Sequence, residues 1–83
     1  SKNFNAVLIN LENYDDRFES ILDQIIKFIV AKIRNTEELR EEIADYDVVY
    51  QIIVTDINFN FWLKVSNGTI LYKKGINYRK VSM

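Results

Sequence analysis

The chain has 83 residues, a net charge of −1 and no cysteine, histidine or proline. A chain this short forms at most one domain and buries only roughly 60% of its unfolded surface. The absence of cysteine and histidine excludes disulfide frameworks, thiolate catalysis and the commonest zinc sites, so we expect a protein with no enzymatic activity, no cofactor and no metal.

The first expected element is a helix over about residues 4–12. Phe4 and Leu11 lie seven residues apart, and the same spacing continues into the next segment. This pattern is compatible with one long helix or with two helices that break near residues 13–16. A short strand at 7–9 is the less favoured alternative.

A long amphipathic helix is expected over about residues 15–34. Its apolar residues recur at positions that share one helix face: Phe18, Ile21, Leu22, Ile25, Ile26, Ile29 and Ile33. Asn13 or Asp15 is the expected N-terminal cap. Phe28 and Val30 widen the stripe beyond one contact surface, so we expect this helix to be contacted on two sides.

A second, shorter helix is expected over about residues 36–45. Asn35 and Glu38 have the spacing of a capping box, with asparagine in place of the usual serine or threonine. Leu39 and Ile43 form the narrow apolar stripe of this helix, which predicts a modest contact with the rest of the domain.

The apolar period then changes from helical to two. Residues 47–55 are β-branched and continuous, which is typical of a strand covered on both faces. A four-residue turn leads to a second strand over 59–66 and sets its register, in which Val54 pairs with Phe59. The same register pairs Ile52 with Phe61, Tyr50 with Leu63 and Val48 with Val65.

Asn67-Gly68 is a strong signal for a two-residue hairpin of type I′, because both positions of that turn require positive φ. A third strand is therefore expected over about 69–74. The chain turns again at 74–77, and a fourth strand is expected over 78–83.

These elements predict a single α+β domain over residues 1–83. Its N-terminal helices pack on an antiparallel β-meander of three to four strands, and the sheet face that carries Phe61 and Leu63 lies beneath the long helix.

The opposite face of the sheet contains a large indole among polar residues. In the expected register, Trp62 lies across from Gln51 and Lys73, and the face is half apolar. Two explanations stay open. Lys73 packs over the indole in a cation–π contact, or a further segment, a partner or a ligand covers this face.

The stretch DYDVVYQIIVTDINFNFWLKVSNGTILYKKG, residues 45–75, resembles the first half of a sterol carrier protein type-two-like domain. The shared features are an apolar strand ending near Asp56, an aromatic-rich strand, Asn67-Gly68 and a closing Gly75. The helices upstream match in type and order. The family domain continues with a strand, a helix and a last strand, so we expect either a fragment or a shortened member whose partner chain closes the domain.

The resemblance implies a non-enzymatic lipid-binding or accessory domain, in which a helix-covered sheet encloses an apolar tunnel for a fatty acid, an acyl chain or a sterol. An apolar pocket of this kind is the usual design for such ligands. The expected lining residues are Phe18, Leu22, Ile25, Ile29, Phe61, Leu63 and Tyr72. The competing interpretation is that these side chains pack against one another.

The alternative function is a protein-interaction module that forms a homodimer. The wide stripe of the long helix, with Phe28 and Val30, and the uncovered sheet edge at the C-terminus both favour association. Nucleic-acid binding would use the basic segment 72–80, but the pI of about 5.3 argues against it. No apolar run reaches the ~18 residues of a membrane span and no export signal is evident, so we expect a soluble, cytoplasmic protein.

Three carboxylates lie at expected strand ends: Asp45, Asp47 and Asp56. They are the only clustered candidates for a hard-metal site or an acid–base pair. Aspartate in such positions more often forms turns or ends helices, so we expect no catalytic role for them.

Overall fold

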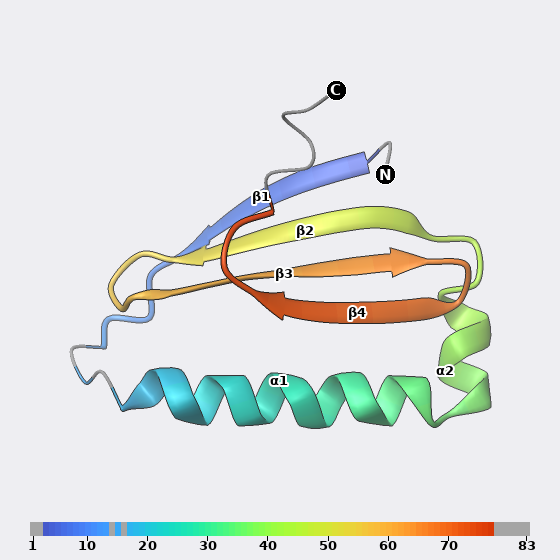
Figure 1. Ribbon diagram of the computed structural model, residues 1–83, viewed down its shortest axis with the longest axis horizontal. Coiled ribbons are helices and arrows are strands. Elements are labelled where there is room, and N and C mark those ends of the chain that lie inside the picture. Colours follow the sequence, from blue (N-terminus) through green and yellow to red (C-terminus); the bar gives the residue numbers. More distant parts are fainter. Residues whose placement is uncertain (1–2, 14, 16, 78–83) are drawn as a thin grey trace.

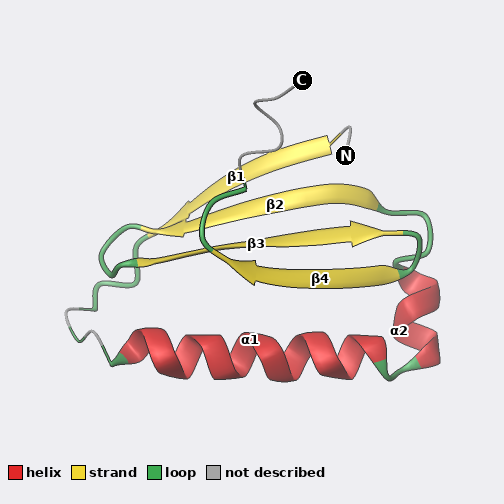
Figure 2. Ribbon diagram, viewed as in Figure 1, coloured by secondary structure: helices red, strands yellow, loops and turns green. Residues whose placement is uncertain are grey.

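The computed structural model describes residues 3–13, 15 and 17–77. In chain order the elements are β1 (Asn3–Ile9), α1 (Phe18–Arg34), α2 (Glu37–Glu42), β2 (Asp47–Val54), β3 (Phe59–Ser66) and β4 (Thr69–Lys74). The strands form one sheet in the order β1-β2-β3-β4, and α1 runs along its β4 side (Figure 1). Figure 2 shows α2 standing across the end of α1, where the chain returns to the sheet.

The N-terminal segment is a strand, so the prediction of a helix over residues 4–12 is wrong. β1 pairs with β2 in parallel, with Val7 opposite Ile52 and Ile9 opposite Val54. β2 is apolar on both faces, as parallel strands usually are, and β1 satisfies the backbone groups along one of its edges. The seven-residue spacing of Phe4 and Leu11 suggested a helix, but Phe4 lies in a strand and Leu11 follows it in a loop.

The sheet is mixed, with β1 parallel to β2 and the other neighbours antiparallel. A parallel pair requires a crossover connection, and α1 and α2 supply it between β1 and β2. The expected α+β class is confirmed, whereas the expected order, with helices first, is wrong. The fourth strand expected over residues 78–83 lies outside the described residues.

The expected meander of β2, β3 and β4 is confirmed with its register. Val54 pairs with Phe59 and Leu63 pairs with Tyr72. The turn between β3 and β4 has φ values of 52° at Asn67 and 75° at Gly68, as a type I′ hairpin requires.

The core lies between α1 and the sheet. Phe59 is its most buried large side chain, with only 1% of its surface exposed. Its ring lies 5.3 Å from that of Phe61, which in turn meets Tyr72 edge-on at 5.6 Å. Both ring distances suit favourable aromatic pairs. Around Phe59 and Phe61 the buried cluster also contains Ile52, Val54 and Ile57.

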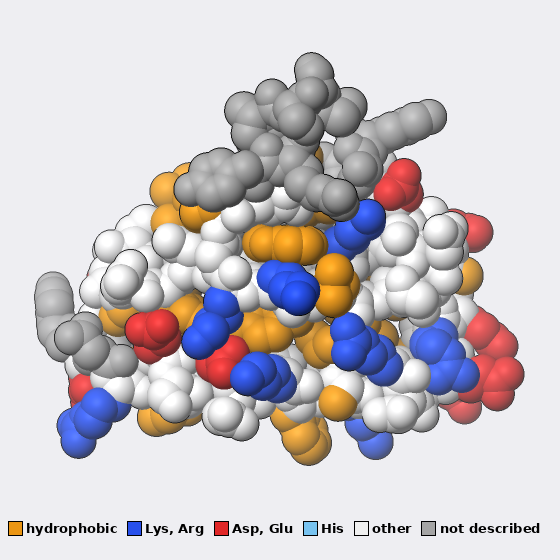
Figure 3. All heavy atoms as spheres, in the orientation of Figure 1, with side chains coloured by type: hydrophobic (Ala, Val, Ile, Leu, Met, Phe, Trp, Pro, Cys, Tyr) orange, Lys and Arg blue, Asp and Glu red, His pale blue; other side chains and the backbone are white. Residues whose placement is uncertain are grey.

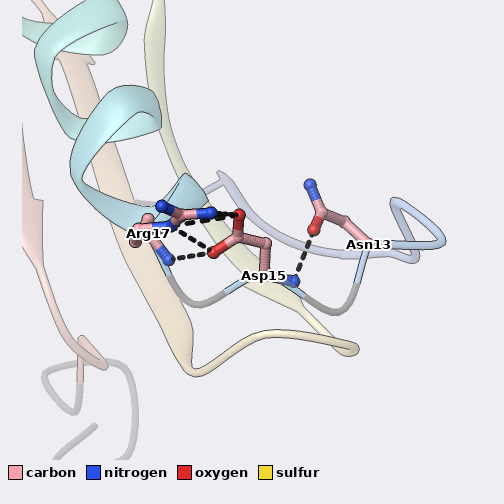
Figure 4. Close-up of polar contacts among 3 residues, drawn as sticks. All are labelled: Asn13, Asp15 and Arg17. Atoms are coloured by element: carbon pink, nitrogen blue, oxygen red, sulfur yellow. Dashed lines mark hydrogen bonds and ion pairs between the residues drawn. The ribbon is translucent and has the colours of Figure 1, made fainter.

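The loop before α1 is held by two carboxylates. Asp15 accepts hydrogen bonds from the backbone and side chain of Arg17, and Asn13 accepts one from the backbone N–H of Asp15 (Figure 4). Asp56 accepts the N–H groups of Asn13 and Leu11 at 2.6 and 2.8 Å. The hydrogen bonds from Arg17 lower the pKa of Asp15, and those from Asn13 and Leu11 lower the pKa of Asp56.

Both helices begin slightly later than expected. Phe18 is the first residue of α1, and neither Asn13 nor Asp15 is its N-terminal cap, because the residue in that position is Arg17. Thr36, and not Asn35, occupies the cap position of α2. The Asn35 side chain instead donates to the carbonyl of Ala31 and so stabilises the C-terminal end of α1.

Candidate functional site

The seven residues expected to line an apolar pocket separate into two groups. Phe61 is buried, and four more pack around the buried cluster as partly buried side chains: Phe18, Leu22, Leu63 and Tyr72. Ile25 and Ile29 lie elsewhere, with 48% and 50% of their surfaces exposed. The structure therefore brings five of the seven together and directs the other two toward solvent.

Two apolar rows run side by side along α1. The row that faces the sheet consists of Leu22, Ile26, Val30 and Ile33. The second row, which we call the outer stripe, consists of Ile21, Ile25, Phe28 and Ile29, and all four are exposed. Each residue of an α-helix is rotated by about 100° about the helix axis from the one before it. The residues of the outer stripe therefore lie next to the sheet-facing row on the helix surface, and not opposite to it.

The outer stripe forms a contiguous apolar patch on the surface of the described residues. The exposed fraction of the residue surface is 74% for Phe28 and 52% for Ile21. Four side chains of this size present on the order of 400 Å² of contiguous apolar surface, which is comparable with the largest apolar patch of a typical monomer, a patch that is often functional. Apolar side chains also protrude below α1 in Figure 3. This stripe is the strongest candidate for a binding surface on the described residues.

Charged side chains border the outer stripe only at its ends. Arg17 precedes the stripe and Lys32 follows it, while Gln24 is its uncharged polar neighbour. The acidic residues of α1 lie elsewhere, with Glu19 and Asp23 on the side toward Lys74 of β4, and the other acids nearby are on α2, at the right of Figure 3. The centre of the stripe therefore suits an apolar partner surface.

The side of α1 that meets β4 carries a polar cluster. The Tyr72 hydroxyl donates to Oδ1 of Asp23 at 2.6 Å, and Nζ of Lys27 lies 3.0 Å from Oδ2 of the same carboxylate. The bonds from Tyr72 and Lys27 lower the pKa of Asp23. Burial and the Asp23 carboxylate raise the pKa of Tyr72. A shallow, open depression of about 210 Å³ adjoins the cluster and is lined by Glu19, Ser20, Asp23 and Lys74.

Asp23 was not among the candidate residues identified from the sequence. Asp23 is 7% exposed, because it lies at the border of the sheet-facing row. Two features of the sequence could have indicated a partner for Asp23. Lys27 lies four residues later on the same helix face, and Tyr72 lies on the apolar face of the sheet. The chain uses this cluster to fix α1 against β4.

Tyr72→Phe is expected to lower the free energy of unfolding by about 1.5–2 kcal/mol at neutral pH, since it removes a hydrogen bond to a charged group. The lowered pKa of Asp23 gives stability that is present above the ordinary carboxyl value of 3.8 and is lost as the pH falls through the folded value. The raised pKa of Tyr72 adds stability that is lost above pH 10, where the unfolded tyrosine ionises.

The measurement is urea unfolding of both proteins at pH 7 and at about pH 2.5. The cost of Tyr72→Phe should shrink as the pH falls through the lowered pKa of Asp23, because the protonated carboxyl accepts a weaker bond. An equal cost at both values would contradict the role assigned to the Asp23 carboxylate.

A returning segment covers the middle of the far face of the sheet. After β4 the chain turns at Gly75, where φ is 100°, and crosses the sheet toward β1 (Figure 1). Gln51, only 3% exposed, anchors this segment. Its Nε2 donates to the carbonyls of Phe61 and Gly75 at 3.0 and 3.1 Å, and its Oε1 accepts the N–H of Asn77 at 2.7 Å. A segment of the chain itself is thus part of what covers the face of Trp62.

Gln51→Leu is expected to destabilise the domain by about 2 kcal/mol, because it leaves buried backbone groups of the returning segment without their partner. Asn60→Leu is the matched control, since Asn60 lies on the same face but is partly exposed. Urea midpoints and amide hydrogen exchange at Asn77 would measure the effect. Equal midpoints for the two variants, with slow exchange at Asn77 in both, would contradict the anchoring role.

The three carboxylates at strand ends do not form one site. Asp47 begins β2 opposite Ser66, whereas Asp56 follows the other end of the same strand. The Asp56 carboxylate is occupied by backbone N–H groups. Among residues 3–13, 15 and 17–77, no group of three metal-ligating side chains comes together.

Comparisons of the chain with protein-family models, with curated proteins and with solved structures find no match. The resemblance to a sterol carrier protein type-two-like domain therefore stays a hypothesis that rests on residues 45–75. In the part of the chain that the structure describes, neither helix is both long enough and apolar enough to cross a bilayer.

Proposed function

We propose that this domain is a non-enzymatic protein-interaction module that self-associates through the outer stripe of α1. The observation that carries the proposal is the exposure of four large apolar side chains on one helix: Ile21, Ile25, Phe28 and Ile29. Water around such a surface is released when a second apolar surface covers it, and this release is the main driving force of association.

The size of the stripe sets the expected affinity. A stable interface buries about 800 Å² on each partner, and the four side chains supply roughly half of that area. The remainder would come from neighbouring residues of α1, such as Lys32. Association costs translational and rotational entropy, and an interface near the lower size limit gains little free energy to offset this cost. We therefore expect an affinity in the micromolar range.

The test is sedimentation velocity of the purified chain between about 1 and 200 µM. The expected result is a shift from a 9.9 kDa species to one of twice that mass as the concentration rises. A single 9.9 kDa species at every concentration would remove the proposal.

Binding of a fatty acid, acyl chain or sterol is the alternative function. It would use Phe18, Leu22, Phe61, Leu63 and Tyr72, which surround the core cluster, and a ligand there would gain ~0.8 kcal/mol for each buried CH₂. The same side chains already pack on Phe59, so entry of a ligand would require α1 to move away from the sheet. Titration of delipidated protein with a fluorescent fatty acid tests this function, and saturable binding at one site per chain would favour it over self-association alone.

A further inference from the structure

Three of the four residues of the outer stripe are arranged symmetrically about one position. Ile21, Ile25 and Ile29 are four residues apart, and they form a straight ridge along the helix. All three are about half exposed, at 52%, 48% and 50%. Ile25 is the midpoint of the ridge, with an isoleucine at equal spacing on either side.

We infer that two copies of the chain pack α1 against α1 in an antiparallel arrangement, with the two-fold axis passing beside Ile25. A two-fold interface brings one surface patch against the same patch of the second copy, so the patch has to complement itself. With Ile25 on the axis, Ile21 of each copy meets Ile29 of the other. Ridges of this spacing interdigitate at a crossing angle of about −50°, the commonest class of helix packing.

Charge favours the antiparallel direction. The outer stripe has a cation at its C-terminal end, Lys32, and the same end of the helix carries the negative end of the helix dipole. A parallel pair would place the Lys32 side chains of the two copies next to each other. An antiparallel pair separates the two Lys32 side chains, places each beside the Asp15–Arg17 ion pair that precedes α1 in the other copy, and sets the two helix dipoles in opposite directions.

Charge also indicates that a second copy of the chain, and not an anionic membrane, covers the outer stripe. α2 follows directly after α1 and carries Glu37, Glu38, Glu41 and Glu42, with Arg40 as the only cation among its six residues. These carboxylates lie at the end of α1 that a membrane-bound stripe would bring to the bilayer surface, and anionic headgroups would repel them. In the antiparallel pair they extend beyond the apolar contact and stay in water.

The inference rests on the proposed self-association and is tested by disulfide cross-linking. The chain has no cysteine, so Ile25→Cys introduces a single thiol. On the two-fold axis, the two thiols come within the Cβ separation of about 4 Å that a disulfide needs. Gln24→Cys is the matched control, because it is exposed on the same turn but points about 100° away from position 25.

Under mild oxidation in the concentration range where the wild-type chain is dimeric, Ile25→Cys is expected to cross-link at least ~10 times faster than Gln24→Cys. Circular dichroism checks that both variants are folded. Equal rates in a protein that sediments as a dimer would overturn the helix-pair arrangement and leave the proposed function in place. Faster cross-linking of Leu8→Cys on β1 would likewise overturn it and assign the dimer to the sheet edge. A wild-type chain that stays monomeric would overturn the inference together with the proposed function.

Discussion

Phe59→Ala is expected to lower the free energy of unfolding by about 3–5 kcal/mol, the range for removing a large side chain from a packed core. Phe59 is 1% exposed and contacts the buried cluster of Ile52, Val54 and Phe61. The loss combines the transfer of the ring to water with a cavity that the surrounding strands fill only in part. A domain of this size has a total stability of about 5–10 kcal/mol, so the variant would be close to unfolding at room temperature.

Phe28→Ala is the matched control, because it makes the same substitution at a ring that is 74% exposed. Its cost in dilute solution, where the chain is monomeric, should stay within about 0.5 kcal/mol. Urea denaturation followed by circular dichroism measures both variants. Similar midpoints for Phe59→Ala and Phe28→Ala would show that the core is not where the structure places it.

The second large effect is expected on self-association. Phe28→Glu places a charge at the most exposed apolar position of the outer stripe, so that dimer formation would have to bury a carboxylate without a partner. The dissociation constant should rise by at least ~100-fold, a change typical of an interface residue that contributes strongly to binding. Sedimentation velocity of the variant and of the wild-type chain at matched concentrations measures the change.

Gln24→Glu is the control that distinguishes the effect of a charge within the outer stripe from the effect of a more negative net charge. It adds the same carboxylate to the same helix, at an exposed position beside the outer stripe rather than within it. Its dissociation constant should stay within a few-fold of the wild-type value. A loss of association that is as large in Gln24→Glu as in Phe28→Glu would indicate that net charge, and not the apolar stripe, governs self-association.

The β-meander was predictable from the sequence because its determinants are local. The period of two along β2 and β3 and the turn residues Asn67 and Gly68 fix which residues pair. The observed register, with Val54 opposite Phe59, matches the prediction at every named pair. Gln51 and Trp62 likewise lie opposite each other, as expected.

β1 could not be predicted in the same way, because its structure depends on a distant partner. Residues 3–9 are followed by turn-forming residues such as Asn10 and Asn13 but not by a tight hairpin turn, and their pairing with β2 joins Asn3 to Val48 across the whole crossover. A short apolar segment of this kind is ambiguous between helix and strand until its partner is known. The returning segment on Gln51 was missed for the same reason.

The helix α1 was predicted correctly as an element but not in its rotation. The sequence gives nine large apolar residues between Phe18 and Ile33, more than one face can hold, so periodicity alone does not decide which of them face the sheet. In the fold Val30 is buried, whereas Ile25 and Ile29 are exposed. Of the two sides on which α1 was expected to be contacted, the sheet covers one, and contact on the outer stripe stays a prediction.

The measurement that tests this account most directly is a set of ¹⁵N–¹H correlation spectra recorded while the wild-type chain is diluted from about 500 to 10 µM, a range that spans a micromolar dissociation constant. We expect concentration-dependent amide shifts on α1, centred on Ile25 and extending to Ile21 and Ile29, with β1 unchanged. Spectra that do not change on dilution, or changes confined to β1, would contradict the assignment of the outer stripe as the contact between two copies.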